Sequence, residues 1–245
     1  MPNPFSRPVT LALERGYFED GLEVTTFRNG SALAEALTRG EVDVGVGGHL
    51  QTLGAGGQVF VGPLGFERAP DHLPIALVAS RDDLEGAAVG VSARAAISEL
   101  QLRIFLGPAY ETVTLVPMPF GELAGAFRRG EIQAASAPDP FAAQLVEEGL
   151  GRIVDRGSLS RALPDGARVM IAGLAATRAG AEPAKRLVDA IGRAIDELRD
   201  VPAPPGQHVP HFDRALEPAD LQLVCDLAFE HGLVERRVDA AELLF

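Results

Sequence analysis

Few residues in this chain of 245 amino acids could carry covalent or metal chemistry. The single cysteine, Cys225, lies in an apolar run typical of a buried helix, and no activating base is near it in the sequence. His208 and His211 form the tightest histidine pair, but they lie in a proline-rich stretch without a cysteine or carboxylate set beside them. These patterns favour neither a cysteine nucleophile nor a metal centre, and they imply no cofactor.

A glycine cluster follows one expected strand. Gly45, Gly47 and Gly48 are similar to the start of a nucleotide-binding turn, but Leu50 replaces the third glycine of the dinucleotide pattern. The chain also lacks a phosphate-binding loop with its lysine and the glycine-flanked serine of a hydrolase nucleophile. Catalysis therefore has little support in the sequence.

The charge of the chain restricts its partners. There are 34 acidic and 22 basic residues, which gives a net charge of -12. Such a surface repels nucleic acids and anionic lipid headgroups, so we expect no nucleic-acid partner. Lys185 is the only lysine, which makes arginine the default group for binding an anion. No apolar stretch is long enough to span a bilayer.

One module occurs twice, 90 residues apart, at residues 36–44 and 126–134. Each copy reads as the last turn of an amphipathic helix with an arginine, then a glycine suited to the left-handed position after a helix, then a strand. The repeat predicts two similarly wound α/β halves. A capping box between Ser98 and Gln101 is expected at the start of one helix.

Periodicity predicts the remaining elements. The expected helices and strands alternate, as in wound α/β folds. The expected helices are 9–15, 99–106, 121–129, 183–199 and 218–231, with a further helix after Asn29, and the expected strands are 22–27, 42–46, 58–61, 75–79, 88–91, 112–116 and 131–136.

The order of several short motifs resembles the type II periplasmic solute-binding family, in its sulfonate, nitrate, taurine and thiamine-precursor branch. The similar segments follow one another in the family's order along nearly the whole chain. They are residues 13–24, 36–44, 84–91, 130–141, 187–198 and 231–234.

The resemblance implies a two-lobed α/β fold in which each lobe is a mixed sheet wound with helices and the ligand lies between the lobes. The expected lobes are 1–80 with 178–245, and 81–177. The implied function is capture of a small, anionic organic solute by hinge closure, as the monomeric substrate-binding component of an ABC importer with a membrane permease as partner. The alternatives are an enzyme on the same fold, such as a desulfinase or another small-molecule lyase, and a cytoplasmic ligand sensor.

The beginning of the sequence departs from the family. The family has a short strand before the segment that matches residues 2–8, and this sequence has no residues left to form it. Residues 2–8 also do not read as a signal peptide. A truncated or misassigned start would explain both features and agree with a periplasmic location. A cytoplasmic protein is the alternative.

In such a fold, helix N-termini that follow strands can bind an oxyanion with free backbone N–H groups. Arg94 is the expected cation, and Arg7 has a similar claim. Each expected ligand-binding residue also has an ordinary structural explanation, such as a helix cap, a tight turn, a core histidine or an exposed arginine. The expected ligand-binding residues are Asn3, Phe5, Ser6, Arg7, Asn29, Gly30, Ser31, Gly47, Gly48, His49, Ser92, Arg94, Phe120, Pro138 and Asp139.

Overall fold

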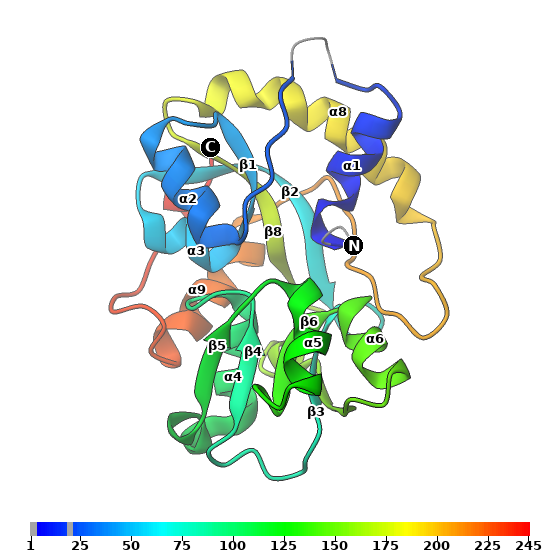
Figure 1. Cartoon of the computed structure of the whole chain (residues 1–245). Helices are drawn as coiled ribbons and strands as arrows, with labels where there is room; N and C mark the ends of the chain where they lie inside the picture. The colour runs from blue at the N-terminus through cyan, green and yellow to red at the C-terminus, as the bar shows by residue number, and fades with distance from the viewer. Residues whose placement is uncertain (1–3, 19–21) are drawn as a thin grey trace. The chain divides into compact units, whose positions relative to one another are not determined.

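The computed structural model describes residues 4–18 and 22–245, and the chain divides into two compact units (Figure 1). The terminal unit comprises the described residues of 4–67, 168–202 and 210–245. The central unit comprises 68–167 and 203–209. Each unit contains its own sheet and its own helices, which confirms the predicted α/β class.

The terminal unit has a three-stranded sheet in the order β1-β8-β2. Its strands are β1 (Val44–Gly48), β2 (Gln58–Arg68) and β8 (Arg168–Thr177). Its helices are η1 (Pro4–Ser6), α1 (Arg7–Glu14), α2 (Gly30–Arg39), α3 (His49–Ala55), α8 (Ala181–Arg199), α9 (Pro218–Glu230) and η4 (Ala240–Leu243). Neighbouring side chains of β2 and β8 pack on opposite faces, since Phe60 and Ala175 belong to the cluster of α2 and α9, whereas Val61 and Leu174 pack with that of α1 and α8.

The central unit has a five-stranded mixed sheet in the order β5-β4-β6-β3-β7. Its strands are β3 (Ile75–Ala79), β4 (Ala88–Val91), β5 (Thr114–Pro117), β6 (Ala134–Pro138) and β7 (Arg152–Arg156). Its helices are α4 (Ile97–Leu106), η2 (Gly107–Thr112), η3 (Phe120–Glu122), α5 (Leu123–Arg128), α6 (Phe141–Glu147) and α7 (Ser158–Arg161). Val78 packs with the α5 and α6 side chains, while Leu77 packs on the face that Leu102 of α4 covers.

The division between the units differs from the expected one. The expected boundaries followed residues 80 and 177, but β3 pairs with β6 and β7 in the central sheet, and β8 pairs with β1 in the terminal sheet. The chain also returns to the central unit at residues 203–209. The sequence did not predict this return, because the segment contains no helix or strand.

The predicted strand at 22–27 does not form, and this prediction is wrong. Residues 22–26 are exposed, and the segment pairs with no strand of the described sheets. A strand needs a hydrogen-bonded neighbour, and alternation of apolar residues alone does not provide one. The expected helix after Asn29 forms, but Asn29 and not Ser31 is its N-cap, and no strand precedes it.

None of the helices formed by the described residues combines the length and apolar character that crossing a bilayer requires.

Candidate functional site

The expected ligand residues of the terminal unit fall into two groups. Asn3 lies outside the described residues. Phe5, Ser6 and Arg7 lie at the start of α1, where Phe5 is buried and the guanidinium of Arg7 pairs with Glu14 at 2.9 Å. Arg7 is therefore already paired along its own helix.

The second group is brought together by Gln51, a residue that the sequence did not single out. Asn29 caps α2, since its side chain accepts a hydrogen bond from the Ala32 N–H at 3.0 Å. The half-buried Gln51 side chain packs against Gly48 at the end of β1, and a Cβ added to Gly30 would lie 3.3 Å from Gln51 Cδ. A side chain on Gly48 would overlap the Gln51 amide, so glycine is required there for this contact. The amide thus lies between Gly30 and Gly48, two of the predicted positions.

Gly47 and Ser31 are neighbours of these contacts in the sequence. Gly47 is buried in β1, and a Cβ there would lie 3.0 Å from the Thr52 hydroxyl. Ser31 is half-buried in the first turn of α2. A larger residue at Gly47 would therefore have to displace Thr52 or Ala175.

His49 does not share the exposure of its neighbours. Its ring is fully buried, contacts Phe60 edge to face at a centroid distance of 5.8 Å, and places Nε2 3.6 Å from Cys225 Sγ. Burial lowers the pKa of His49 to about 4 and raises the pKa of the Cys225 thiol to about 12. At neutral pH the pair is therefore an uncharged imidazole and a protonated thiol. Such a thiol is a poor nucleophile.

The sequence did not anticipate this pair, because 176 residues separate the histidine from the cysteine. The only signal was that both lie in apolar surroundings in the sequence. Among the described residues, no group of three or more His, Cys, Asp or Glu could hold a metal ion.

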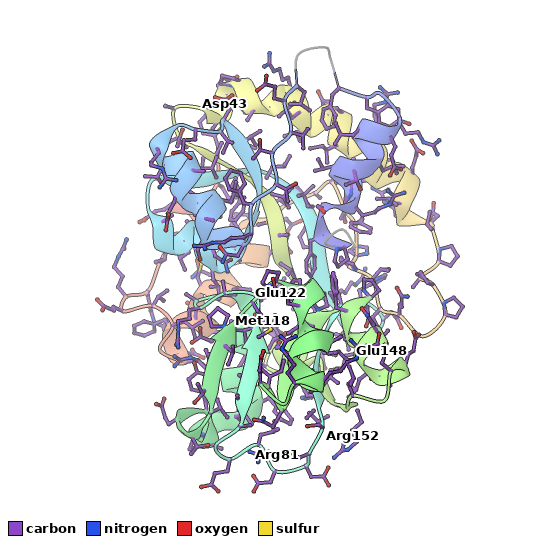
Figure 2. The ribbon with its side chains drawn as sticks, viewed as in Figure 1. Asp43, Arg81, Met118, Glu122, Glu148 and Arg152 are labelled. Atoms are coloured by element: carbon purple, nitrogen blue, oxygen red, sulfur yellow. The ribbon has the colours of Figure 1, made fainter. Side chains whose placement is uncertain are left out.

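In the central unit, Phe120, Pro138 and Asp139 have structural partners. Phe120 lies in the η3 turn, between Met118 and Glu122 (labelled in Figure 2), and packs on Phe141 with ring centroids 5.4 Å apart. Pro138 is buried at the end of β6.

The Asp139 carboxylate is almost fully buried and has three partners. It pairs with Arg156 Nη1 at 3.0 Å and accepts hydrogen bonds from the N–H groups of Ala143 at 3.1 Å and His208 at 2.7 Å. The carboxylate therefore caps α6 and anchors the segment 203–209.

Arg94 has a different environment from these residues. It is exposed in the loop between β4 and α4, after the half-buried Ser92. Its side chain makes no hydrogen bond or ion pair with any other residue that the structure describes. It lines a pocket of about 380 Å³ within the central unit. The other lining residues come from α4, η2 and the β5 region, and they are Arg103, Tyr110, Glu111, Val113, Thr114 and Leu115.

A buried carboxylate supports this pocket, which we call the Arg94 pocket. Glu99 is 5% exposed, and its Oε2 accepts the Ala95 N–H at 2.7 Å. Its Oε1 accepts hydrogen bonds from Arg103 Nη2 at 3.1 Å and from the Tyr110 hydroxyl at 2.6 Å. Arg103 also stacks on Tyr110, 4.2 Å from the ring centroid. Burial and the bond to Glu99 raise the pKa of Tyr110 to about 12, so its hydroxyl keeps its proton.

The same network holds the backbone of the loop. Ala95 has a φ of 51°, the only positive φ of a non-glycine residue in the described part of the chain. Residues held in this conformation cost free energy and are found where surrounding contacts fix them. Glu99 provides such a contact next to Arg94.

The predicted capping box of Ser98 and Gln101 is wrong. Helix α4 begins at Ile97 with Ala96 as its N-cap, so Ser98 lies inside the first turn. Its hydroxyl is buried without a hydrogen-bond partner within the described residues. Glu99 takes the role of the first-turn acceptor instead, and its spacing from Arg103 of four residues was the available signal.

Comparison with known proteins gives matches in structure alone. No family model matches the sequence, and no curated protein matches it. The structure is similar to the alkanesulfonate-binding protein SsuA from Xanthomonas axonopodis pv. citri bound to MOPS, with a TM-score of 0.76 and 19% identity over 99% of this chain and 96% of that chain. The periplasmic aliphatic sulphonate-binding protein SsuA from Escherichia coli matches with a TM-score of 0.68 and 22% identity over 99% of this chain and 94% of that chain.

A third structure is similar over the whole chain. The CA3427 gene product of Candida albicans, described as having the generic periplasmic binding protein fold, matches with a TM-score of 0.73 and 14% identity over 100% of this chain and 94% of that chain. These matches agree with the resemblance seen in the sequence. The chain therefore has the periplasmic binding protein fold.

Proposed function

We propose that the protein is the substrate-binding component of an ABC-type importer and that it captures a small organic oxyanion. The observation that carries this proposal is the unpaired Arg94 guanidinium in a pocket of about 380 Å³. A guanidinium without a protein partner can bind a carboxylate, sulfonate or phosphate through two parallel hydrogen bonds. Two of the similar structures are sulfonate-binding proteins, which supports this class of ligand.

Arg94 belongs to a minority of the arginines in the described part of the chain. In a protein with a net charge of -12, most arginines of the described residues have carboxylate or carbonyl partners. Arg94 keeps its hydrogen-bonding capacity for another molecule. A small anion is attracted at this point while large polyanions are repelled by the surface as a whole.

The terminal unit has a candidate polar group of its own, the Gln51 amide. This amide makes no hydrogen bond with the other residues that the structure describes, and it lies against Gly30 and Gly48. An amide offers both a donor and an acceptor, so it suits a polar group of a ligand without adding charge. Closure of the two units on the ligand, delivery to a membrane permease and an extracytoplasmic location are parts of the same proposal.

The enzymatic alternative has one specific candidate, the pair of His49 and Cys225. Its burial and its neutral state argue against a nucleophile there. We therefore propose binding without covalent chemistry.

The test begins with mass spectrometry of small molecules that copurify with the full chain. Methanesulfonate, ethanesulfonate and nitrate are then titrated by calorimetry and thermal shift into the wild-type protein, Arg94→Ala and Arg236→Ala. Arg236 is an exposed arginine of the terminal unit and serves as the matched control. We expect a sulfonate to raise the melting temperature of the wild type and Arg236→Ala but not of Arg94→Ala, since a ligand stabilises the state that binds it. Equal binding by all three proteins would refute the assignment of Arg94.

A further inference from the structure

Glu99 lies behind the Arg94 pocket and is not one of the residues that line it. Its side chain is buried, whereas two of its hydrogen-bond partners, Arg103 and Tyr110, are lining residues. Its third partner is the backbone N–H of Ala95, the residue that directly follows Arg94. Any effect of Glu99 on a ligand in the pocket must therefore pass through these partners.

Glu99 occupies the third position of α4, from which a glutamate side chain commonly caps the start of a helix. In a capping box such a side chain accepts a hydrogen bond from the N–H of the N-cap residue, which in α4 is Ala96. The Glu99 carboxylate reaches one residue further and accepts the Ala95 N–H at 2.7 Å. The contact thus ties the loop before the helix to the first helical turn.

The residue that this contact holds has an unusual backbone conformation. Ala95 has a φ of 51°, and every other residue with a positive φ in the described part of the chain is a glycine. An alanine pays a steric cost in this region, so its conformation needs a compensating contact. A hydrogen bond to a carboxylate is a strong one and can supply that compensation.

The Glu99 carboxylate is itself fixed from its other oxygen. Its Oε1 accepts hydrogen bonds from Arg103 Nη2 at 3.1 Å and from the Tyr110 hydroxyl at 2.6 Å. Arg103 also offsets the negative charge of Glu99 through their ion pair. As a result, the carboxylate holds the backbone next to Arg94 while the Arg94 guanidinium keeps no ion pair within the described residues.

We infer that Glu99 is a positioning residue of the oxyanion site: it holds the left-handed turn at Ala95 and through that turn directs the Arg94 guanidinium into the pocket. This inference rests on the proposed function and adds a residue to its site. Arg103 and Tyr110 belong to the same chain of contacts because they hold the Glu99 carboxylate. Loss of Glu99 should therefore weaken oxyanion binding even though Glu99 does not line the pocket.

The experiment removes the Glu99 carboxylate together with its cation, so that no unpaired charge is left behind. Glycine adopts the left-handed backbone without the steric cost of alanine, so a rescue by Ala95→Gly would show that Glu99 acts through this turn. Such a rescue also separates this role from a direct contact between Arg103 and the ligand. The full-chain proteins are the wild type, Arg94→Ala, the double variant Glu99→Met with Arg103→Met, the same double variant with Ala95→Gly, and the control Arg128→Met with Glu148→Met, which removes an ion pair of the same unit outside the pocket.

Methanesulfonate, ethanesulfonate and nitrate are titrated into each protein by calorimetry, and urea denaturation establishes that each variant is folded. We expect the Glu99 and Arg103 double variant to bind a sulfonate about tenfold more weakly than the wild type, since the cost of the left-handed alanine is no longer offset. Ala95→Gly in that background should restore most of the affinity. The control should bind as the wild type does, and Arg94→Ala should not bind.

A second measurement needs no ligand. Hydrogen exchange of the Ala95 amide, followed by NMR, should be about tenfold faster in the double variant than in the wild type, because the amide loses its acceptor. Equal exchange rates in the two proteins would contradict the role given to the contact between Ala95 and Glu99.

The binding results separate the inference from the proposed function. If the double variant binds as the wild type does while Arg94→Ala does not bind, the positioning role is wrong and the oxyanion site stands. Weaker binding that Ala95→Gly does not restore also refutes the positioning role. If Arg94→Ala binds as well as the wild type, or if the wild type binds neither a sulfonate nor nitrate, the proposed site fails and the inference fails with it.

Discussion

The two copies of the repeated module, residues 36–44 and 126–134, have the same local structure in different units. Gly40 and Gly130 have φ values of 69° and 70°. In both copies the glycine N–H and the following glutamate N–H bond back to the helix in the same pattern, with distances from 2.9 to 3.1 Å. Each copy also contains a bidentate ion pair, between Arg39 and Glu41 in the first and between Arg129 and Glu131 in the second.

The copies diverge where their strands end. Strand β1 runs into Gly48, which contacts the unpaired amide of Gln51, whereas β6 runs into Asp139, whose carboxylate is closed by Arg156 and two backbone N–H groups. The shared part is a scaffold that ends a helix and starts a strand. The few residues after each strand, and not the repeat itself, therefore decide whether the polar side chains there are already paired.

The largest effect is expected from Asp139→Ala, which tests this contrast between the two strand ends. The substitution leaves the largely covered Arg156 guanidinium without its carboxylate and removes the acceptor of a first-turn N–H of α6. We expect a loss of about 3–5 kcal/mol in the free energy of unfolding of the central unit, measured by urea denaturation. Gln51→Ala at the other strand end should cost less than about 1 kcal/mol. Similar losses for the two variants would show that the strand ends do not differ as described.

The buried histidine after β1 predicts a dependence of stability on pH. Because the pKa of His49 in the folded protein is about 4 and that of an ordinary histidine is 6.5, the unfolded chain binds more protons between these values. Stability is therefore present above pH 6.5 and is lost as the pH falls toward 4, by about 3 kcal/mol from this residue.

His49→Leu should flatten that part of the curve of unfolding free energy against pH. In the central unit, burial and Arg156 also lower the pKa of His208, but this residue is less buried, so His208→Gln should change the slope less. An unchanged slope in His49→Leu would contradict the assignment.

The shared glycines offer a test of equivalence. A Cβ at Gly40 or Gly130 would meet no atom within 4 Å, so the cost of alanine comes from the left-handed backbone alone. Gly40→Ala and Gly130→Ala should each destabilise their unit by about 1–2 kcal/mol in thermal denaturation. A difference of more than about 1 kcal/mol between them would mean that the two turns are not equivalent.

The smallest expected effect concerns the exposed ion pairs of the repeat. The hydrogen bond from Arg39 lowers the pKa of Glu41, and that from Arg129 lowers the pKa of Glu131. An NMR titration should find both carboxyl groups below their ordinary value, with a return toward it in Arg39→Gln and Arg129→Gln. Salt should weaken both shifts, because exposed pairs are screened. A shift in one copy but not the other would break the symmetry.

Much of the fold could be predicted from the sequence because its signals are local. The ranges of β3 and β4 agree with the predicted strands residue for residue, and the predicted helix 218–231 differs from α9 by one residue. The turn at Gly40 was readable because it depends on neighbouring residues. The strand at 22–27 failed because it depends on a partner strand elsewhere in the chain.

The candidate site was harder to predict, because its features depend on contacts between residues that are distant in the sequence. Arg94 could be selected from its place after a strand, but its lack of a partner is a property of the fold. Gln51 is an ordinary glutamine in the sequence and becomes distinctive only beside Gly30 and Gly48. The contact between His49 and Cys225 joins residues that no local pattern connects.

The return of residues 203–209 to the central unit has a practical consequence for dissecting the protein. An expressed fragment of residues 68–167 would contain Asp139 and Arg156 but not the His208 N–H that completes the environment of this carboxylate. The other fragment, made by joining residue 67 to residue 168, would contain the segment 203–209 without the Asp139 carboxylate to which it bonds. Excision at the two obvious crossings would therefore yield two incomplete pieces, and a separable central unit requires a peptide corresponding to 203–209 to be supplied in trans or fused to its end.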